Sequence, residues 1–237
     1  MALKSLLFSF ALLIIMGSTV VRADDLNIAV TSSTLSALGV NFGSFNVAGG
    51  SSGVFAPLAG TSGTIKNLSF TTTTPLNQSF LLTSFITFSS NPNLSLDLTF
   101  INLGVSGQSP CSQPAAVGQF CTPAFPALVT AANPLGLSPY NFRNIAGGSI
   151  LSFSVAGNYV NGGVSTPFLG VFSSTFDVPY QNALPTLNSS GSVPLNLAGT
   201  FTPNAAAVPE PTTLLLLGSG LVGIAAKVKR RKKQSRV

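Results

Sequence analysis

Apolar side chains recur at every second position through much of the chain between residues 24 and 204, and this alternation constrains the fold more than any other feature. In the clearest run, apolar and polar residues alternate over residues 94–100. The same pattern returns at 151–155, 172–178 and 193–201. A period of two places one face of a β-strand in a core and the other in water. The pattern therefore predicts antiparallel β-sheet with a hydroxyl-rich outer face.

Clusters of Gly, Asn, Ser and Pro separate these runs and are typical of turns, at residues 48–50, 90–93, 161–163 and 188–191. No segment of the body combines apolar residues at helical spacing with capping residues, so we expect little helix there. Many short strands without a repeat of fixed length favour two packed sheets. The sequence predicts an all-β body over residues 24–204, folded as an antiparallel β-sandwich of the kind that includes jelly rolls.

Residues 1–23 have the three parts of a secretory signal peptide. Lys4 supplies a positive charge, an apolar run follows over residues 6–16, and Val21-Arg22-Ala23 is typical of a cleavage site. The apolar run is shorter than the ~20 residues that a membrane span needs. We therefore expect an N-terminal signal helix, cleavage after Ala23, and export of the mature chain from the cytoplasm.

Residues 205–237 differ from the body in composition. Pro209, Glu210 and Pro211 interrupt any helix at this point, and an apolar stretch follows over residues 212–226. The basic tail, residues 227–237, includes Lys227, Lys229, Arg230, Arg231, Lys232 and Lys233. Such a tail stays on the cytoplasmic side of a membrane. We therefore expect a short transmembrane helix at 212–226 that anchors the precursor in the inner membrane, with the body outside.

This ending resembles the PEP-CTERM sorting signal of Gram-negative bacteria, because a Pro-Glu-Pro element, a glycine-containing apolar stretch and a basic tail follow one another over residues 209–237. The resemblance implies that an exosortase, a membrane-bound processing enzyme, recognises Pro209, Glu210 and Pro211 and removes the anchor. The mature protein would then lie at the cell surface or outside the cell, and the resemblance also implies association with extracellular polysaccharide or biofilm. A plain membrane anchor would need neither the Pro-Glu-Pro nor the glycines, and a lipid-anchor signal would end in an apolar tail.

The formal net charge of +6 does not indicate a nucleic-acid partner, because the positive charge is concentrated at the two ends of the chain. In the body, Lys66 and Arg143 are the only basic residues, and aspartates outnumber them. A body without a basic face cannot neutralise a phosphate backbone. We therefore expect no nucleic-acid partner.

The residues that usually carry catalysis are scarce. The chain contains no histidine, which excludes histidine-activated nucleophiles and most zinc-enzyme sites. The acidic residues of the body are Asp24, Asp25, Asp97 and Asp177, and none is paired at a spacing typical of acid–base catalysis or calcium binding. Asp24 and Asp25 follow the expected cleavage site, where we expect little order. We predict a non-enzymatic protein without a cofactor or metal.

Two cysteines lie within a stretch rich in proline and glycine, residues 106–139, which we expect to form a long surface loop. In an exported protein, two cysteines as close in sequence as Cys111 and Cys121 are expected to form a local disulfide. A redox-active pair would favour the spacing Cys-x-x-Cys, which is absent. We therefore predict a structural disulfide between Cys111 and Cys121.

The predicted function is that of an exported, non-enzymatic protein of the cell surface or extracellular matrix. The alternative is an adhesion module that binds carbohydrate or protein. Tyr140, Phe142 and Arg143 form the only aromatic–basic cluster of the body. A sugar-stacking patch and packing in the core are the two interpretations of this cluster.

Overall fold

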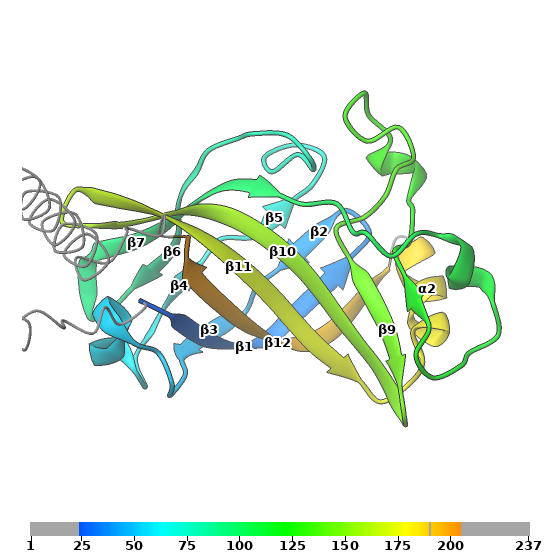
Figure 1. The fold of residues 1–237 in the computed structure, drawn as a ribbon, viewed down its shortest axis with the longest axis horizontal. Helices are drawn as coiled ribbons and strands as arrows, with labels where there is room; N and C mark the ends of the chain where they lie inside the picture. The colour runs from blue at the N-terminus through cyan, green and yellow to red at the C-terminus, as the bar shows by residue number, and fades with distance from the viewer. Residues whose placement is uncertain (1–23, 190, 205–237) are drawn as a thin grey trace, which may run out of the picture. The chain divides into compact units, whose positions relative to one another are not determined.

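The computed structural model describes residues 24–189 and 191–204, and these residues form a closed barrel of eight antiparallel strands (Figure 1). Around the barrel the strands follow the order β11, β12, β1, β3, β4, β6, β7, β10, and β10 pairs with β11 to close the ring. The bounds of these strands are β1 Leu26–Ser36, β3 Ser44–Val47, β4 Ser62–Ile65, β6 Leu82–Phe88, β7 Asn91–Ile101, β10 Gly148–Asn161, β11 Val164–Phe176 and β12 Ser192–Pro203.

The predicted sandwich is therefore wrong, although the prediction of an all-β body is confirmed. A sandwich needs two sheets with free edges, whereas β11 pairs along its length with β10 on one side and over residues 168–173 with β12 on the other. Strand pairing also shifts register in β1 between Val30 and Ser33, and in β10 between Ala156 and Gly157. Such irregularities bend and twist strands, which helps one sheet to curl and close on itself.

Shorter elements surround the barrel. They are the strands β2 Gly39–Asn41, β5 Leu68–Ser69, β8 Phe120–Cys121 and β9 Asn141–Ile145, the 3₁₀ helices η1 Gly53–Leu58, η2 Ser109–Ser112 and η3 Pro126–Leu128, and the α-helix α2 Tyr180–Asn188. Within the part of the chain that the structure describes, α2 is the one α-helix. The expectation of little helix in the body is therefore confirmed.

Phenylalanine rings fill the interior of the barrel. Phe172 on β11 is fully buried, and its ring centroid lies 4.9 Å from that of Phe153 on β10 and 5.4 Å from that of Phe201 on β12. The rings of Phe42 and Phe85 approach Phe172 at 5.1 Å and 6.3 Å. Aromatic pairs at these separations stabilise a core beyond the effect of their buried area. One connected aromatic cluster therefore joins strands from opposite sides of the ring.

Glycines on the inner face of β10 and β11 make room for these rings. Gly157 pairs with Phe168 on the neighbouring strand, and Gly170 pairs with Phe201. A Cβ atom at Gly170 would lie 2.5 Å from the Phe201 ring, and one at Gly157 would lie 2.9 Å from the Phe168 ring. The inner alternation thus includes glycines opposite phenylalanines, because a narrow barrel cannot hold a large side chain at every inward position.

The predicted signal peptide at 1–23, the transmembrane helix at 212–226 and the basic tail at 227–237 lie outside the described residues. Cleavage after Ala23 therefore stays a prediction. Across residues 24–189 and 191–204, no helix reaches the length and hydrophobicity that a membrane crossing requires.

Candidate functional site

The two ends of the barrel differ in what they carry. We call one the exit end, because the first and last described residues, Asp24 and Asn204, lie there. Tyr159 donates a hydrogen bond of 2.7 Å from its hydroxyl to Oδ2 of Asp24, and the backbone N–H of Asn204 donates to the Pro167 carbonyl at 2.8 Å. Pro167 pairs with Asn158 near the same end. Both connections to the predicted export and sorting signals therefore leave the body from one end.

Asp24 is ordered, contrary to the expectation for the start of the mature chain. Besides the contact with Tyr159, its Oδ1 accepts a hydrogen bond of 3.1 Å from the backbone N–H of Val54 at η1. Burial is the first cause that raises the pKa of Tyr159 above its usual value, and the hydrogen bond with Asp24 adds to it. The η1 segment buries Phe55 against this end of the barrel. Asp24 therefore fastens the first strand to η1 and β10.

The opposite end is covered by residues 102–139, by the turn between β1 and β2, and by α2, and we call it the loop-covered end (Figure 1). Most of the exposed large apolar side chains lie in these segments or directly before α2. They are Leu38, Val105, Val117, Phe120, Val129, Leu135 and Val178. Exposed apolar side chains on neighbouring segments are candidates for a binding surface.

Helix α2 carries a helical pattern that the sequence interpretation missed. Tyr180, Ala183, Leu184 and Leu187 are its buried residues, and their spacing is that of one helix face. Pro185 lies inside the helix and normally breaks one. The burial of this face against the barrel outweighs the cost of the proline.

Three amide side chains hold α2 in place. Nδ2 of Asn144 donates to Oε1 of Gln181 at 3.0 Å, and Nε2 of Gln181 donates to Oε1 of Gln119 at 3.0 Å. Asn144, which is 2% exposed, also accepts a hydrogen bond from the backbone N–H of Tyr180 at 3.1 Å. Amides that hydrogen-bond to one another around the buried Asn144 fix the relative position of the segments that carry them. The cluster joins α2, β9 and the segment that precedes β8.

The predicted disulfide between Cys111 and Cys121 is present, and Cys121 is fully buried. The bond closes the segment that contains Gln119, so it constrains one member of the amide cluster. The surrounding residues 106–139 are only in part the surface loop that the sequence predicts, because Phe125 and Leu128 of this stretch lie in the core.

Removal of this disulfide should lower the free energy of unfolding. In the chain-entropy account a closed segment of this length stabilises by about 2.5–3 kcal/mol. We expect denaturant unfolding of the Cys111→Ala/Cys121→Ala variant to show a loss of that size against the oxidised protein. Adding a reductant should lower wild-type stability to the level of the variant and leave the variant unchanged. Equal stability of the oxidised and reduced wild-type protein would contradict this expectation.

Tyr140 belongs to the core, so it cannot stack on a sugar. It is fully buried, and its hydroxyl lies 2.9 Å from the Ser36 carbonyl and 3.1 Å from the Gly39 carbonyl, to which it donates. Burial raises the pKa of Tyr140 well above its usual value. Phe142 is also fully buried. The sugar-stacking interpretation therefore fails for both aromatic residues, and Tyr140 instead fixes the turn between β1 and β2.

Arg143 alone of the cluster reaches the outside. Its guanidinium lies over the ring of Phe120 on the adjacent β8, 5.2 Å from the ring centroid, in a cation–π arrangement. The Phe120 side chain is 48% exposed. This pair forms part of the exposed apolar surface at the loop-covered end.

The aspartates of the body do not converge on a site. Asp97 points outward from β7 and accepts a hydrogen bond of 2.6 Å from the backbone N–H of Ser84, where the left-handed backbone of Ser84 marks a bulge in β6. Asp177 follows β11 at the opposite end from Asp24. Among the described residues, no three acidic, cysteine or histidine side chains gather as metal ligands would. The carboxylates of Asp24 and Asp97 accept hydrogen bonds from backbone N–H groups and so hold backbone segments in place.

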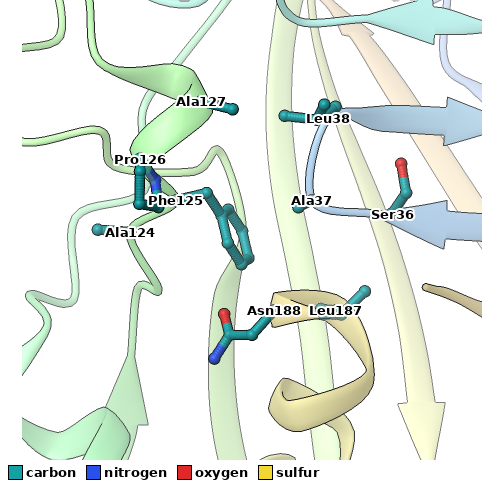
Figure 2. Close-up of a pocket in the computed structure, with 9 residues that line it drawn as sticks. All are labelled: Ser36, Ala37, Leu38, Ala124, Phe125, Pro126, Ala127, Leu187 and Asn188. Carbon is teal, nitrogen blue, oxygen red and sulfur yellow. The ribbon is translucent and has the colours of Figure 1, made fainter. Parts of the chain in front are cut away.

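A cavity of about 520 Å³ opens at the loop-covered end. Its walls are residues 36–38 in the turn between β1 and β2, residues 124–127 at the start of η3, and residues 187–188 at the end of α2 (Figure 2). Figure 2 shows the ring of Phe125 directed into the space between these segments, with the methyl group of Ala127 and the side chain of Leu38 facing each other across it. None of the side chains that line the cavity is ionisable.

The sequence interpretation did not identify this cavity. Its walls come from segments about 90 and 60 residues apart along the chain, and no motif links them. The one signal in the sequence was the helical spacing of the buried residues in α2. The remaining lining residues are three alanines, a serine, a leucine, a phenylalanine and a proline, which form no recognisable motif.

Comparison with known families identifies one feature of the chain. The family model described as the PEP-CTERM protein-sorting motif matches residues 207–231. The match contains Pro209, Glu210 and Pro211 and the first part of the basic tail, and confirms the resemblance found in the sequence. The chain thus carries the C-terminal motif of an exported protein that is sorted through an exosortase-type enzyme. No curated protein and no solved structure matches this chain.

Proposed function

We propose that this chain is an exported, non-enzymatic protein of the cell surface or the extracellular matrix. The observation that carries the proposal is the match of the sorting motif to residues 207–231, directly after the barrel. In this proposal a signal peptide directs export, and the anchored precursor awaits an exosortase-type enzyme. Cleavage near Pro209, Glu210 and Pro211 then releases the barrel from its membrane anchor.

The chemistry of the body supports a non-enzymatic role. Asp24 and Asp97 accept hydrogen bonds from backbone N–H groups and so serve the fold. Lys66 donates from Nζ to the Thr83 carbonyl at 2.6 Å. General acid–base catalysis requires positioned titrating groups within reach of one reacting atom. The few charged groups of the barrel are better explained as structural contacts at separate places.

An adhesion module is the second candidate, and the exposed apolar surface of the loop-covered end favours it. This surface and the cavity lie at the opposite end of the barrel from Asp24, on residues that the structural contacts of the exit end do not use. Extracellular polysaccharide or another surface protein would be the partner. The exposed pair of Phe120 and Arg143, rather than Tyr140, is the place to test for contact with a glycan.

Intact-mass spectrometry of the protein isolated from its host tests the proposal. We expect a mature form that begins at Asp24 and ends close to Pro209, Glu210 and Pro211, recovered from the surface or the medium. Both processing events are read in one measurement, so failure of one does not conceal the other. A single species that keeps residues 212–237 in the membrane fraction would contradict sorting by an exosortase.

A further inference from the structure

We propose that the cavity at the loop-covered end binds a small, uncharged, mainly apolar molecule that carries one hydrogen-bonding group. The cavity volume of about 520 Å³ falls in the range of small-molecule sites in proteins. Neither the sorting motif nor the proposed role in the matrix requires such a site.

The walls define the chemistry of the ligand. Ala37, Phe125 and Leu187 are buried apolar residues that form the inner surface, and Leu38 stands at the mouth with 39% of its side chain exposed. Asn188 is the amide at the rim, and no hydrogen bond joins its side chain to another described residue. An apolar interior with one free amide at its edge fits a ligand with an apolar body and one polar group.

Charge complementarity excludes an ionic ligand. No lysine, arginine, aspartate or glutamate lines the cavity. A charged group that entered it would lose its hydration without gaining a partner, at a cost of several kcal/mol. The ligand is therefore neutral.

Each wall is fixed by hydrogen bonds or packing, so the cavity is formed before a ligand arrives. Tyr140 holds the turn between β1 and β2 through the carbonyls of Ser36 and Gly39. Asn133, which is 1% exposed, holds the η3 segment by donating from Nδ2 to the carbonyls of Leu128 at 3.1 Å and Leu137 at 2.8 Å. A preformed site loses less entropy on binding than one that must order its walls.

The third wall is the last turn of α2, where Leu187 packs into the core, and the amide cluster of Gln119, Asn144 and Gln181 anchors the first turn of the same helix. This wall, the η3 segment and the β1–β2 turn enclose the cavity from three sides. The cavity therefore accommodates a compact molecule better than an extended peptide or the flat surface of a second copy.

Fluorescence titration of the mature protein with N-phenyl-1-naphthylamine, a neutral apolar probe, tests the proposal. We expect saturable binding at one site per chain. The affinity for the anionic probe 1-anilinonaphthalene-8-sulfonate should be lower than that for the neutral probe by about tenfold or more. Ala127→Trp should lower the affinity for the neutral probe by about tenfold or more, because the indole fills the mouth of the cavity opposite Leu38. Ala131→Trp, an exposed site four residues further that does not line the cavity, is the matched control and should bind as wild type does.

Two further variants keep the test decisive. Leu38→Trp blocks the cavity from the opposite wall, and should also weaken binding even if Ala127→Trp disturbs folding. Asn188→Leu preserves the size of the side chain and removes the amide, so it should weaken competition by 1-naphthol more than competition by naphthalene.

Binding that is not saturable, or that is unchanged in both tryptophan variants, overturns the proposal. Displacement of the probe by a neutral oligosaccharide but not by 1-naphthol would assign the cavity to a sugar instead. Because the cavity lies wholly in the body, these outcomes are independent of processing at Pro209, Glu210 and Pro211.

Discussion

Glu210→Ala and Pro211→Ala should each stop processing of the precursor while export across the inner membrane continues. Export depends on the N-terminal signal and on the hydrophobicity of residues 212–226, which these substitutions leave unchanged. In the proposed function, recognition by the exosortase-type enzyme instead depends on the Pro-Glu-Pro element, which lies within the matched motif. We expect an uncut form that still carries residues 212–237 to replace the mature protein almost completely. Cell fractionation and blotting with a tag inside the body, in a host that has the exosortase, measure this change.

Asn204→Ala is a suitable control, because Asn204 lies before the matched residues 207–231. Its hydrogen bond to the Pro167 carbonyl is donated by the backbone N–H, which the substitution keeps. This variant should be processed as wild type.

Replacing the basic residues between Lys227 and Lys233 by glutamine should act differently, since it removes the charges that are expected to hold the tail in the cytoplasm. The anchor should then slip or invert. If the Pro-Glu-Pro variants were processed normally, or if wild type remained full-length in the membrane, the segment would be a plain anchor.

Phe172→Ala should have the largest effect on the stability of the body. Phe172 contacts four other phenylalanine rings in the interior, with centroid separations from 4.9 Å to 6.3 Å. Truncation removes the buried ring and leaves a cavity that the closed barrel cannot collapse around. Phenylalanine-to-alanine changes in cores of this kind cost about 3–5 kcal/mol. Denaturant unfolding followed by circular dichroism measures the loss, which represents a large part of the stability of an ordinary domain.

Phe120→Ala provides the matched control, because it removes the same ring from a position that is 48% exposed. The main recorded contact of this ring is the guanidinium of Arg143, and contacts of that kind at exposed sites are worth about 0.5–1 kcal/mol. We expect a loss of about 1 kcal/mol or less. Equal losses in the two variants would mean that the interior rings do not form a cooperative core.

Much of the body's secondary structure could be predicted from the sequence, because alternation acts along one strand. The run at 94–100 lies in β7, and the run at 151–155 lies in β10. The turn at 161–163 joins β10 to β11, with Gly162 and Gly163 in the left-handed conformation that such a turn requires. In each case the signal lies within a few neighbouring residues.

Helix α2 was predictable in principle and was missed. The spacing of Tyr180, Ala183, Leu184 and Leu187 indicates a helix, but Pro185 argues against one. The balance depends on how much apolar surface the helix buries against the barrel, which is a tertiary quantity. Tyr140 illustrates the same limit, since its neighbour Arg143 is outside and no local pattern shows that Tyr140 is fully buried.

The sequence by itself determined that the chain carries a C-terminal sorting motif and which faces of its strands are apolar, because sorting motifs and alternation are both local. Only the tertiary structure decided that the strands close into a barrel, since a sandwich and a barrel satisfy the same alternation and differ only in the pairing of strands such as β10 and β11. It also decided the position of the cavity, whose β1–β2 wall is held by the hydrogen bond from Tyr140 to Ser36, across more than 100 residues of chain. Contacts over such separations depend on the packing of the whole core, which no single segment of sequence encodes.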